Sequence, residues 1–121
     1  MAETLLIVGR VLLGGLFVVG GLRHFFILPI ITDMMRQQGV PRPRLMLLAG
    51  TVFEIAAGGL LMVGLFVLPA AIGLVLFTIA ASVMMMNFWR LEGEARTAAI
   101  NGWLTNIALV GGLLIAAATE L

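Results

Sequence analysis

The feature that most constrains this chain is a set of long segments almost free of charged residues. They extend over residues 11–22, 45–53, 55–89 and 97–118. A transmembrane helix needs roughly 20 mostly apolar residues. Residues 55–89 are too many for one helix and are interrupted at Pro69, so they complete one membrane span and supply the next. The sequence therefore predicts an all-α integral membrane protein, a bundle of four helices.

The supply of charge supports the same conclusion. Only 11% of the 121 residues are charged, whereas a soluble domain carries roughly 25%. Such a chain could not cover a water-facing surface. The four spans use most of its length, so we expect residues 1–121 to form a single transmembrane domain. No nucleic-acid partner is expected, because the placement of the basic residues is better explained by membrane topology.

Proline and glycine set the expected boundaries, since both interrupt regular helices. The four spans are predicted at about 5–26, 45–65, 69–89 and 98–118. Between Pro29 and Gly39, apolar and polar residues alternate with helical spacing. That pattern predicts a short amphipathic helix lying in the membrane interface between spans one and two.

The arginines are distributed unevenly between the connections. Six of the seven arginines lie in the first and third connections or at their margins: Arg23, Arg36, Arg42, Arg44, Arg90 and Arg96. Short loops rich in basic residues remain in the cytoplasm. We therefore expect a multi-pass protein of the bacterial inner membrane, with cytoplasmic first and third loops and both termini outside.

One carboxylate, Glu54, lies in the middle of the second span. A charge at the bilayer centre costs roughly 2.5–3.5 kcal/mol on insertion scales, so it normally faces the bundle interior beside a partner. Asn106 is expected at the same depth, and Arg10 about 7 Å away along the membrane normal. We predict that Arg10, Glu54 and Asn106 form an intramembrane polar cluster. Two interpretations stay open: the cluster fixes helix register, or it binds a polar head group or relays protons.

Glycines accompany each member of this cluster at a spacing of four residues. Gly50 and Gly58 flank Glu54, Gly14 follows Arg10, and Gly102 precedes Asn106. Small residues at this spacing allow helix backbones to approach closely. The Arg10 face of the first span continues to His24, which we include in the candidate site and expect to be solvated or in contact with head groups.

The chain has no cysteine and a single histidine. Cysteine-ligated metals are therefore excluded within the chain, and one histidine cannot supply a two-histidine haem site. We predict no metal site and no intrinsic cofactor.

Several motifs along the chain resemble the DoxX family of small four-span bacterial membrane proteins. They are GRVLLGGLFVVGGLRHF, the pattern P-x(8)-G-x(3)-E-x(3)-GG from Pro41, NFWRLEGEAR and NIALVGGLL. The positions that match the family's recurrent polar and aromatic residues are Arg10, Glu54, Asn87, Phe88, Trp89 and Asn106. Many relatives carry a histidine just before the Asn-Phe-Trp triplet, where this chain has Met86.

The resemblance implies a function linked to redox chemistry. Some family members are subunits of a thiosulfate:quinone oxidoreductase, and others belong to redox or stress-defence complexes. Any enzymatic activity is accordingly expected only as a subunit of a quinone-linked oxidoreductase, with quinone as the ligand. The expected partners are membrane lipids, quinone, other oxidoreductase subunits and further copies of this chain. The alternatives are a small transporter or lipid-binding protein, and an assembly or anchoring protein without chemistry.

Overall fold

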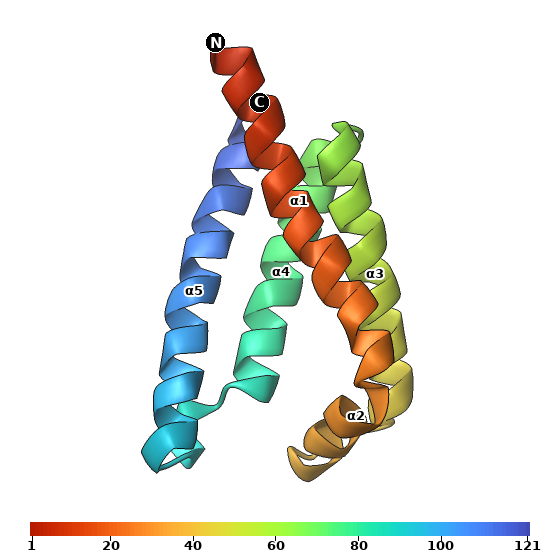
Figure 1. Ribbon diagram of the computed structural model, residues 1–121, viewed down its shortest axis with the longest axis vertical. Helices are drawn as coiled ribbons and strands as arrows, with labels where there is room; N and C mark the ends of the chain where they lie inside the picture. The colour runs from red at the N-terminus through yellow and green to blue at the C-terminus, as the bar shows by residue number, and fades with distance from the viewer.

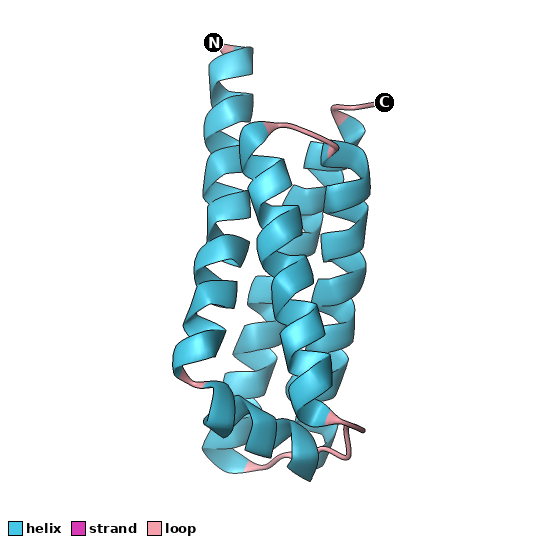
Figure 2. Ribbon diagram, turned by 90° about the vertical axis from the view of Figure 1, so that its right-hand side faces the viewer, coloured by secondary structure: helices cyan, strands magenta, loops and turns pink.

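The computed structural model describes residues 1–121 and contains helices but no strands, which confirms the predicted fold class. Its elements are α1 (Ala2–Phe26), α2 (Leu28–Gln37), α3 (Pro43–Val63), α4 (Val67–Met85), the 3-10 turn η1 (Phe88–Arg90) and α5 (Gly93–Ala118). The four long helices run alternately up and down beside one another, and α2 lies across one end (Figures 1 and 2). The chain therefore has the predicted short helix between its first two long ones.

Four segments are long and apolar enough to cross a membrane: α1, α3, α4 with its η1 extension, and α5. The 19 residues of α4 rise about 29 Å, close to the thickness of a hydrocarbon core. Around the bundle, α1 packs on α3, α3 on α4 and α4 on α5, while α5 meets α1 less extensively. Helices α3 and α5 are thus diagonal neighbours that do not pack together.

The apolar side chains divide between an interior and a lipid-facing surface. The buried cluster takes residues from all four long helices: Phe17, Ala57, Leu61, Val67, Ala70, Ala71, Leu74, Leu113, Ala116 and Ala117. Many other large apolar side chains point outward, among them Leu12, Val52, Leu76 and Ile107. In water this surface would be costly, whereas in a bilayer it matches the acyl chains.

The closest helix contact joins α1 to α3 through two glycines. A Cβ atom placed on Gly58 would lie 2.8 Å from the carbonyl oxygen of Gly14, and one placed on Gly14 would collide with the carbonyl oxygen of Gly58. Neither position has room for a side chain. The expectation that Gly14 and Gly58 bring their helices close together is confirmed.

The ends of α3 follow from its sequence. Pro43 occupies the first turn, where its missing N–H is not needed. At the other end Gly64 has φ of +79°, and both Gly64 and Leu65 donate their backbone N–H groups to the carbonyl of Leu60. A left-handed glycine of this kind ends a helix. The second span accordingly stops at Val63, before the predicted residue 65.

The predicted third span, residues 69–89, lies within the segment Val67–Arg90 that is long and apolar enough to cross a membrane, but the continuous helix α4 ends at Met85. The carbonyl of Met86 is occupied by the Trp103 indole N–H at 2.6 Å and by the Phe88 N–H at 2.9 Å. In a continuing helix that carbonyl would accept from residue 90. Residues 88–90 instead form the separate 3-10 turn η1.

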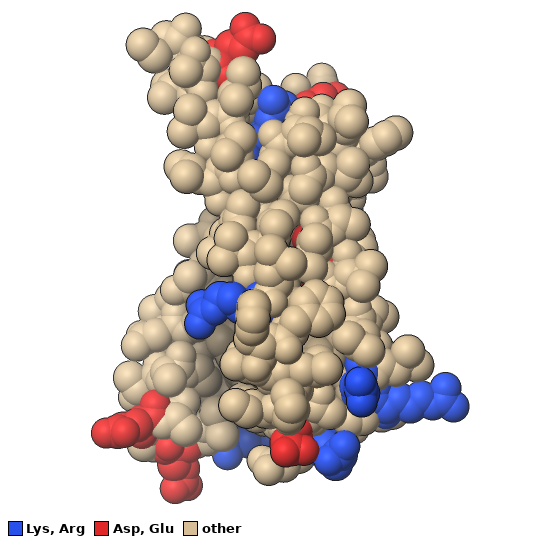
Figure 3. Space-filling model, turned by 45° about the vertical axis from the view of Figure 1, so that its right-hand side comes forward, with Lys and Arg blue, Asp and Glu red and all other residues tan.

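The charged side chains gather at the two ends, and a largely uncharged belt lies between them (Figure 3). Both termini and the α3–α4 turn lie at one end, the terminal end (Figure 1). Helix α2 and the α4–α5 connection lie at the other, which we call the arginine-rich end. It holds six of the seven arginines, the exception being Arg10.

Candidate functional site

Glu54 is enclosed within the bundle, as expected for an acid at this depth. Its residue is 6% exposed, and it lies on the face of α3 that packs against α1. A Cβ atom on Gly20 of α1 would lie 3.2 Å from Glu54 Oε1. The absence of a side chain at Gly20 therefore leaves the space that this carboxyl group occupies.

Two further polar side chains complete a site between α1 and α3. The Nδ1 atom of His24 lies 3.0 Å from the hydroxyl of Thr51 and 3.7 Å from Glu54 Oε2. Glu54 Oε2 is completely buried and has no hydrogen-bond partner. We call His24, Thr51 and Glu54 the α1–α3 polar site.

His24 differs from its expected solvated position. It lies in the last turn of α1, but its side chain is only 27% exposed and is directed toward α3. Gly21, three residues earlier, is buried against Ile55 and the carbonyl of Thr51. This close packing of α1 on α3 brings the imidazole to Thr51 and Glu54. His24 thus belongs to the interior site rather than to the solvated surface.

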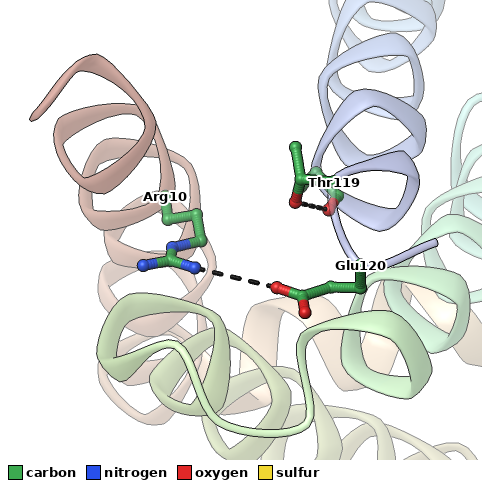
Figure 4. Close-up of polar contacts among 4 residues, drawn as sticks. Arg10, Thr119 and Glu120 are labelled. Carbon is green, nitrogen blue, oxygen red and sulfur yellow. Dashed lines mark hydrogen bonds and ion pairs between the residues drawn. The ribbon is translucent and has the colours of Figure 1, made fainter. Parts of the chain in front are cut away.

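The predicted pairing of Arg10 with Glu54 is wrong. The Arg10 guanidinium lies 3.9 Å from the carboxylate of Glu120, just beyond the end of α5, and packs against Gly64 (Figure 4). Because the helices are antiparallel, Gly20 lies level with Glu54 while Arg10 lies level with Gly64. Ten residues of α1 separate these levels, a distance of about 15 Å. The separation of about 7 Å estimated from the sequence was too small. Counting residues along each span does not include the axial shift between the two helices.

The predicted proximity of Asn106 to Glu54 is also wrong. Asn106 Nδ2 donates to the hydroxyl of Ser82 on α4 at 2.8 Å, and that hydroxyl donates to the backbone carbonyl of Thr78 at 2.7 Å. The Oγ1 atom of Thr78 is buried without a partner. Asn106 lies on α5, which does not pack against α3. Thr78, Ser82 and Asn106 form a second polar group, the α4–α5 polar site.

The two polar sites lie at similar depth. Phe53 and Phe77, which precede Glu54 and Thr78 in sequence, have ring centroids 6.1 Å apart. The predicted cluster is therefore divided between two helix pairs. His24 and Glu54 come together in one, Asn106 lies in the other, and Arg10 lies near the terminal end.

The family-matching residues of the third connection hold the arginine-rich end together. Asn87 is buried, and its Nδ2 donates to Oε1 of Gln38, the residue after α2, at 2.6 Å. Phe88 packs edge-on against Trp89 and Trp103, with ring centroids 5.3 and 6.4 Å apart. These residues therefore join α2, η1 and α5 and do not reach the α1–α3 polar site.

The sequence interpretation missed Thr51, Thr78, Ser82 and Glu120 as partners. The first three are hydroxyl residues inside apolar segments, and Thr51 precedes Glu54 by three positions. Residues with that spacing share one helix face, so Thr51 could have been found from the pattern alone. Glu120 gives no such signal, because its contact with Arg10 joins opposite ends of the chain.

The α1–α3 polar site has the groups needed to hold and pass a proton. A carboxyl group and an imidazole are the side chains most often used for this purpose, and ionisable residues inside a membrane commonly mark proton relays. No group of three His, Cys, Asp or Glu side chains is arranged to hold a metal ion.

Comparison with known proteins places the chain among membrane proteins. A family model described as DoxX matches residues 5–87. The chain is also 24% identical, over 116 residues, to the inner membrane protein YphA of Escherichia coli strain K12, an alignment that covers 96% of this chain and 83% of that protein. No solved structure matches the chain. The family match includes α1, α3 and α4 and therefore the complete α1–α3 polar site.

Proposed function

We propose that this chain, which belongs to the DoxX family, is a multi-pass inner-membrane subunit of a quinone-linked redox complex and carries protons through Glu54 and His24. The inner-membrane location is supported by the similarity to the protein named YphA along almost the whole chain. The concentration of arginine at one end supports a cytoplasmic position for α2 and the α4–α5 connection.

The observation that carries the proposal is the state of the Glu54 carboxyl group. Its Oε2 atom is buried within the bundle without a hydrogen bond, 3.7 Å from His24 Nδ1. A buried polar group normally has a partner, so an orphaned one calls for an explanation. A carboxyl group that exchanges its proton with a neighbour alternates between donor and acceptor. A fixed hydrogen bond would hold it in one of these states.

His24 gives this carboxyl a connection toward the arginine-rich end. Its side chain is partly exposed, whereas that of Glu54 is 8% exposed. An imidazole accepts a proton on one ring nitrogen and releases one from the other. In the proposed path a proton enters at His24 Nε2 and leaves from Nδ1 to Glu54. A modest closing of the 3.7 Å gap completes the transfer.

The bare backbone at Gly20 supports access to Glu54 from the lipid side. Glu54 Oε1 lies against the position where a side chain on Gly20 would be. The neighbouring residue Val19 and the preceding turn at Leu16 are exposed on the outer surface of α1. A quinone head group arriving through the bilayer beside Gly20 receives the proton from Glu54 as its oxygen is reduced. The electrons come from the redox partner of the complex.

The experiment is to replace Glu54 by Gln in the complex isolated from membranes through a tag on this chain. We expect Glu54→Gln to reduce quinone-dependent turnover at least tenfold, since removing general acid–base catalysis typically costs 10²–10⁴-fold. Subunit composition and helix content should stay unchanged. The matched control is Glu92→Gln, the same chemical change at an exposed position between η1 and α5.

Full turnover in Glu54→Gln would overturn the proposal. Solute uptake driven by a proton gradient in quinone-free liposomes, lost in Glu54→Gln, would support the transporter alternative. Full function in both Glu54→Gln and Glu54→Leu would support an assembly or anchoring protein.

A further inference from the structure

A shallow, open cavity of about 420 Å³ lies at the arginine-rich end beside the start of α3. It is lined by Arg36 from α2, by Arg42 immediately before α3, and by Pro43, Arg44, Leu45 and Leu48 from α3. No residue of the α1–α3 polar site lines it. The cavity is therefore a separate feature, independent of the proposed proton path.

The charge around this cavity is strongly positive. Arg36 has an acidic partner, because its Nη1 lies 3.1 Å from Asp33 Oδ1 on the same exposed helix turn. Arg42 and Arg44 form no ion pair with any acidic side chain. Three guanidinium groups and one carboxylate leave a net excess of positive charge at the cavity. Guanidinium groups bind phosphate oxygens through paired hydrogen bonds.

The first turn of α3 adds to this positive field. Its capping residue Arg42 makes no side-chain cap, and Pro43 occupies the first turn without an N–H group. The next backbone N–H groups are left without an intrahelical acceptor, as at any helix start. The positive end of the helix dipole lies at the same place. An anion in this cavity is thus favoured by three side chains and by the backbone.

The remaining lining identifies the kind of anion. Leu45 is largely exposed and Leu48 is partly buried, and both continue from the cavity toward the uncharged belt of the bundle. The aliphatic stems of the arginines add further apolar surface. A free phosphate ion would use the guanidinium groups and leave this apolar wall empty. A phospholipid uses both.

We propose that this cavity binds an anionic phospholipid. Its phosphate contacts Arg42 and Arg44, with Arg36 at the rim, and one acyl chain follows Leu45 and Leu48. Basic pockets at the cytoplasmic side of membrane proteins are suited to such head groups. A zwitterionic lipid fits less well, because its ammonium group would face the same arginines.

The test is native mass spectrometry of the full chain released from nanodiscs that contain equal amounts of phosphatidylglycerol and phosphatidylcholine with the same acyl chains. We expect the wild-type protein to retain phosphatidylglycerol at least fivefold over phosphatidylcholine. An arginine close to an anionic head group contributes about fivefold in affinity, so Arg42→Gln with Arg44→Gln should lower retention by about 25-fold. The lysine pair, Arg42→Lys with Arg44→Lys, should recover part of it.

The matched control is Arg90→Gln with Arg96→Gln. It removes the same charge from the same end of the bundle, at exposed residues outside the cavity. Retention should stay within twofold of wild type. A second arm replaces Leu48 by Trp, which fills the cavity without changing charge and should also lower retention.

Four outcomes would overturn the proposal. An equal loss in the two glutamine pairs would indicate diffuse attraction to the membrane surface. Absence of a preference for phosphatidylglycerol would exclude an anionic lipid. Competition by millimolar inorganic phosphate as strong as that by the lipid would indicate a free-phosphate site. Loss of a dimer, rather than of lipid, in the Arg42 and Arg44 variant would assign the cavity to contact between copies of this chain.

Discussion

The contribution of Glu54 to stability differs from that of the apolar residues around it. Glu54 has an imidazole within 3.7 Å, a fully buried Oε2 and no hydrogen bond to that atom. Replacing a buried ion pair by apolar residues of similar size is often neutral or stabilising, and removing one partner is costly because it leaves the other charged and unpaired. An imidazole can stay neutral when its carboxylate partner is removed, so Glu54 can be replaced without leaving a buried charge. If Glu54 were retained only to fix helix register, its replacement by an apolar residue would destabilise the protein. The stability of a Glu54 variant thus separates the two interpretations left open by the sequence.

We therefore expect Glu54→Leu to unfold at the same temperature as the wild type or a higher one, with a gain in the free energy of unfolding of up to about 2 kcal/mol. Circular dichroism during heating in mild detergent measures this. The companion variant Thr51→Val removes a hydroxyl that does have a partner, His24 Nδ1 at 3.0 Å, and should lose about 1 kcal/mol. A strong loss of stability in Glu54→Leu would favour the structural interpretation.

The partners of individual polar residues were the least predictable part of the site. Glu54 was correctly expected to face the interior, because a carboxyl group exposed to hydrocarbon is too costly. Its neighbour was expected to be Arg10, whereas the structure places His24 there and pairs Arg10 with Glu120. The choice between two basic residues on one helix depends on an axial shift of a few turns. No local pattern in the sequence records that shift.

At the scale of elements, the packing of α1 on α3 depends on glycines that face each other. Gly58 is buried, and a Cβ atom there would lie 2.8 Å from Gly14 O and 3.1 Å from Phe17 Cβ. Its neighbour Gly59 meets nothing within 4 Å. Two adjacent residues of one helix therefore offer a matched comparison of packing and helix propensity.

Gly58→Ala should destabilise the protein by about 1–3 kcal/mol, because the added methyl group forces α1 away from α3. Gly59→Ala should leave stability unchanged or raise it by up to about 1 kcal/mol, since alanine is the better helix former. Unfolding with a denaturing detergent, followed by circular dichroism, compares the two. Equal behaviour of the two variants would show that the close glycine contact contributes nothing to stability.

The same comparison bears on the α1–α3 polar site. His24 reaches Thr51 and Glu54 only because α1 lies close to α3 at Gly14, Gly20 and Gly21. A shift of α1 caused by Gly58→Ala should therefore reduce quinone-dependent turnover as well as stability. Gly59→Ala should leave turnover unchanged.

At the scale of the whole molecule, the arrangement of charge defines two unlike ends. Six arginines lie with α2 and the α4–α5 connection, and the termini lie with the α3–α4 turn. The proposed proton path requires the arginine-rich end to face the cytoplasm, from which protons would enter at His24. The proposed path therefore predicts the orientation of the chain in the membrane, and site-specific labelling tests that orientation directly.

We expect a cysteine introduced at Glu94 to react with a membrane-impermeant maleimide only after the inner membrane is opened. A cysteine introduced at Leu65, in the α3–α4 turn, should react in intact spheroplasts. The chain contains no cysteine of its own, so each label reports one site, and the wild type serves as the unlabelled control. The reverse pattern would contradict the proposed orientation.

The sequence by itself determined the four hydrophobic helices, the short helix between the first two, the glycines that allow helices to approach closely, and the burial of Glu54. Each depends on local composition or on spacing along one helix. Only the tertiary structure decided that α4 separates α3 from α5, that Asn106 bonds to Ser82 and that Arg10 lies level with Gly64. The physical reason is that depth in a membrane follows from counting residues, whereas the neighbour of a side chain depends on the order, rotation and axial shift of packed helices. Those quantities are set by contacts over the whole interface and not by any one segment.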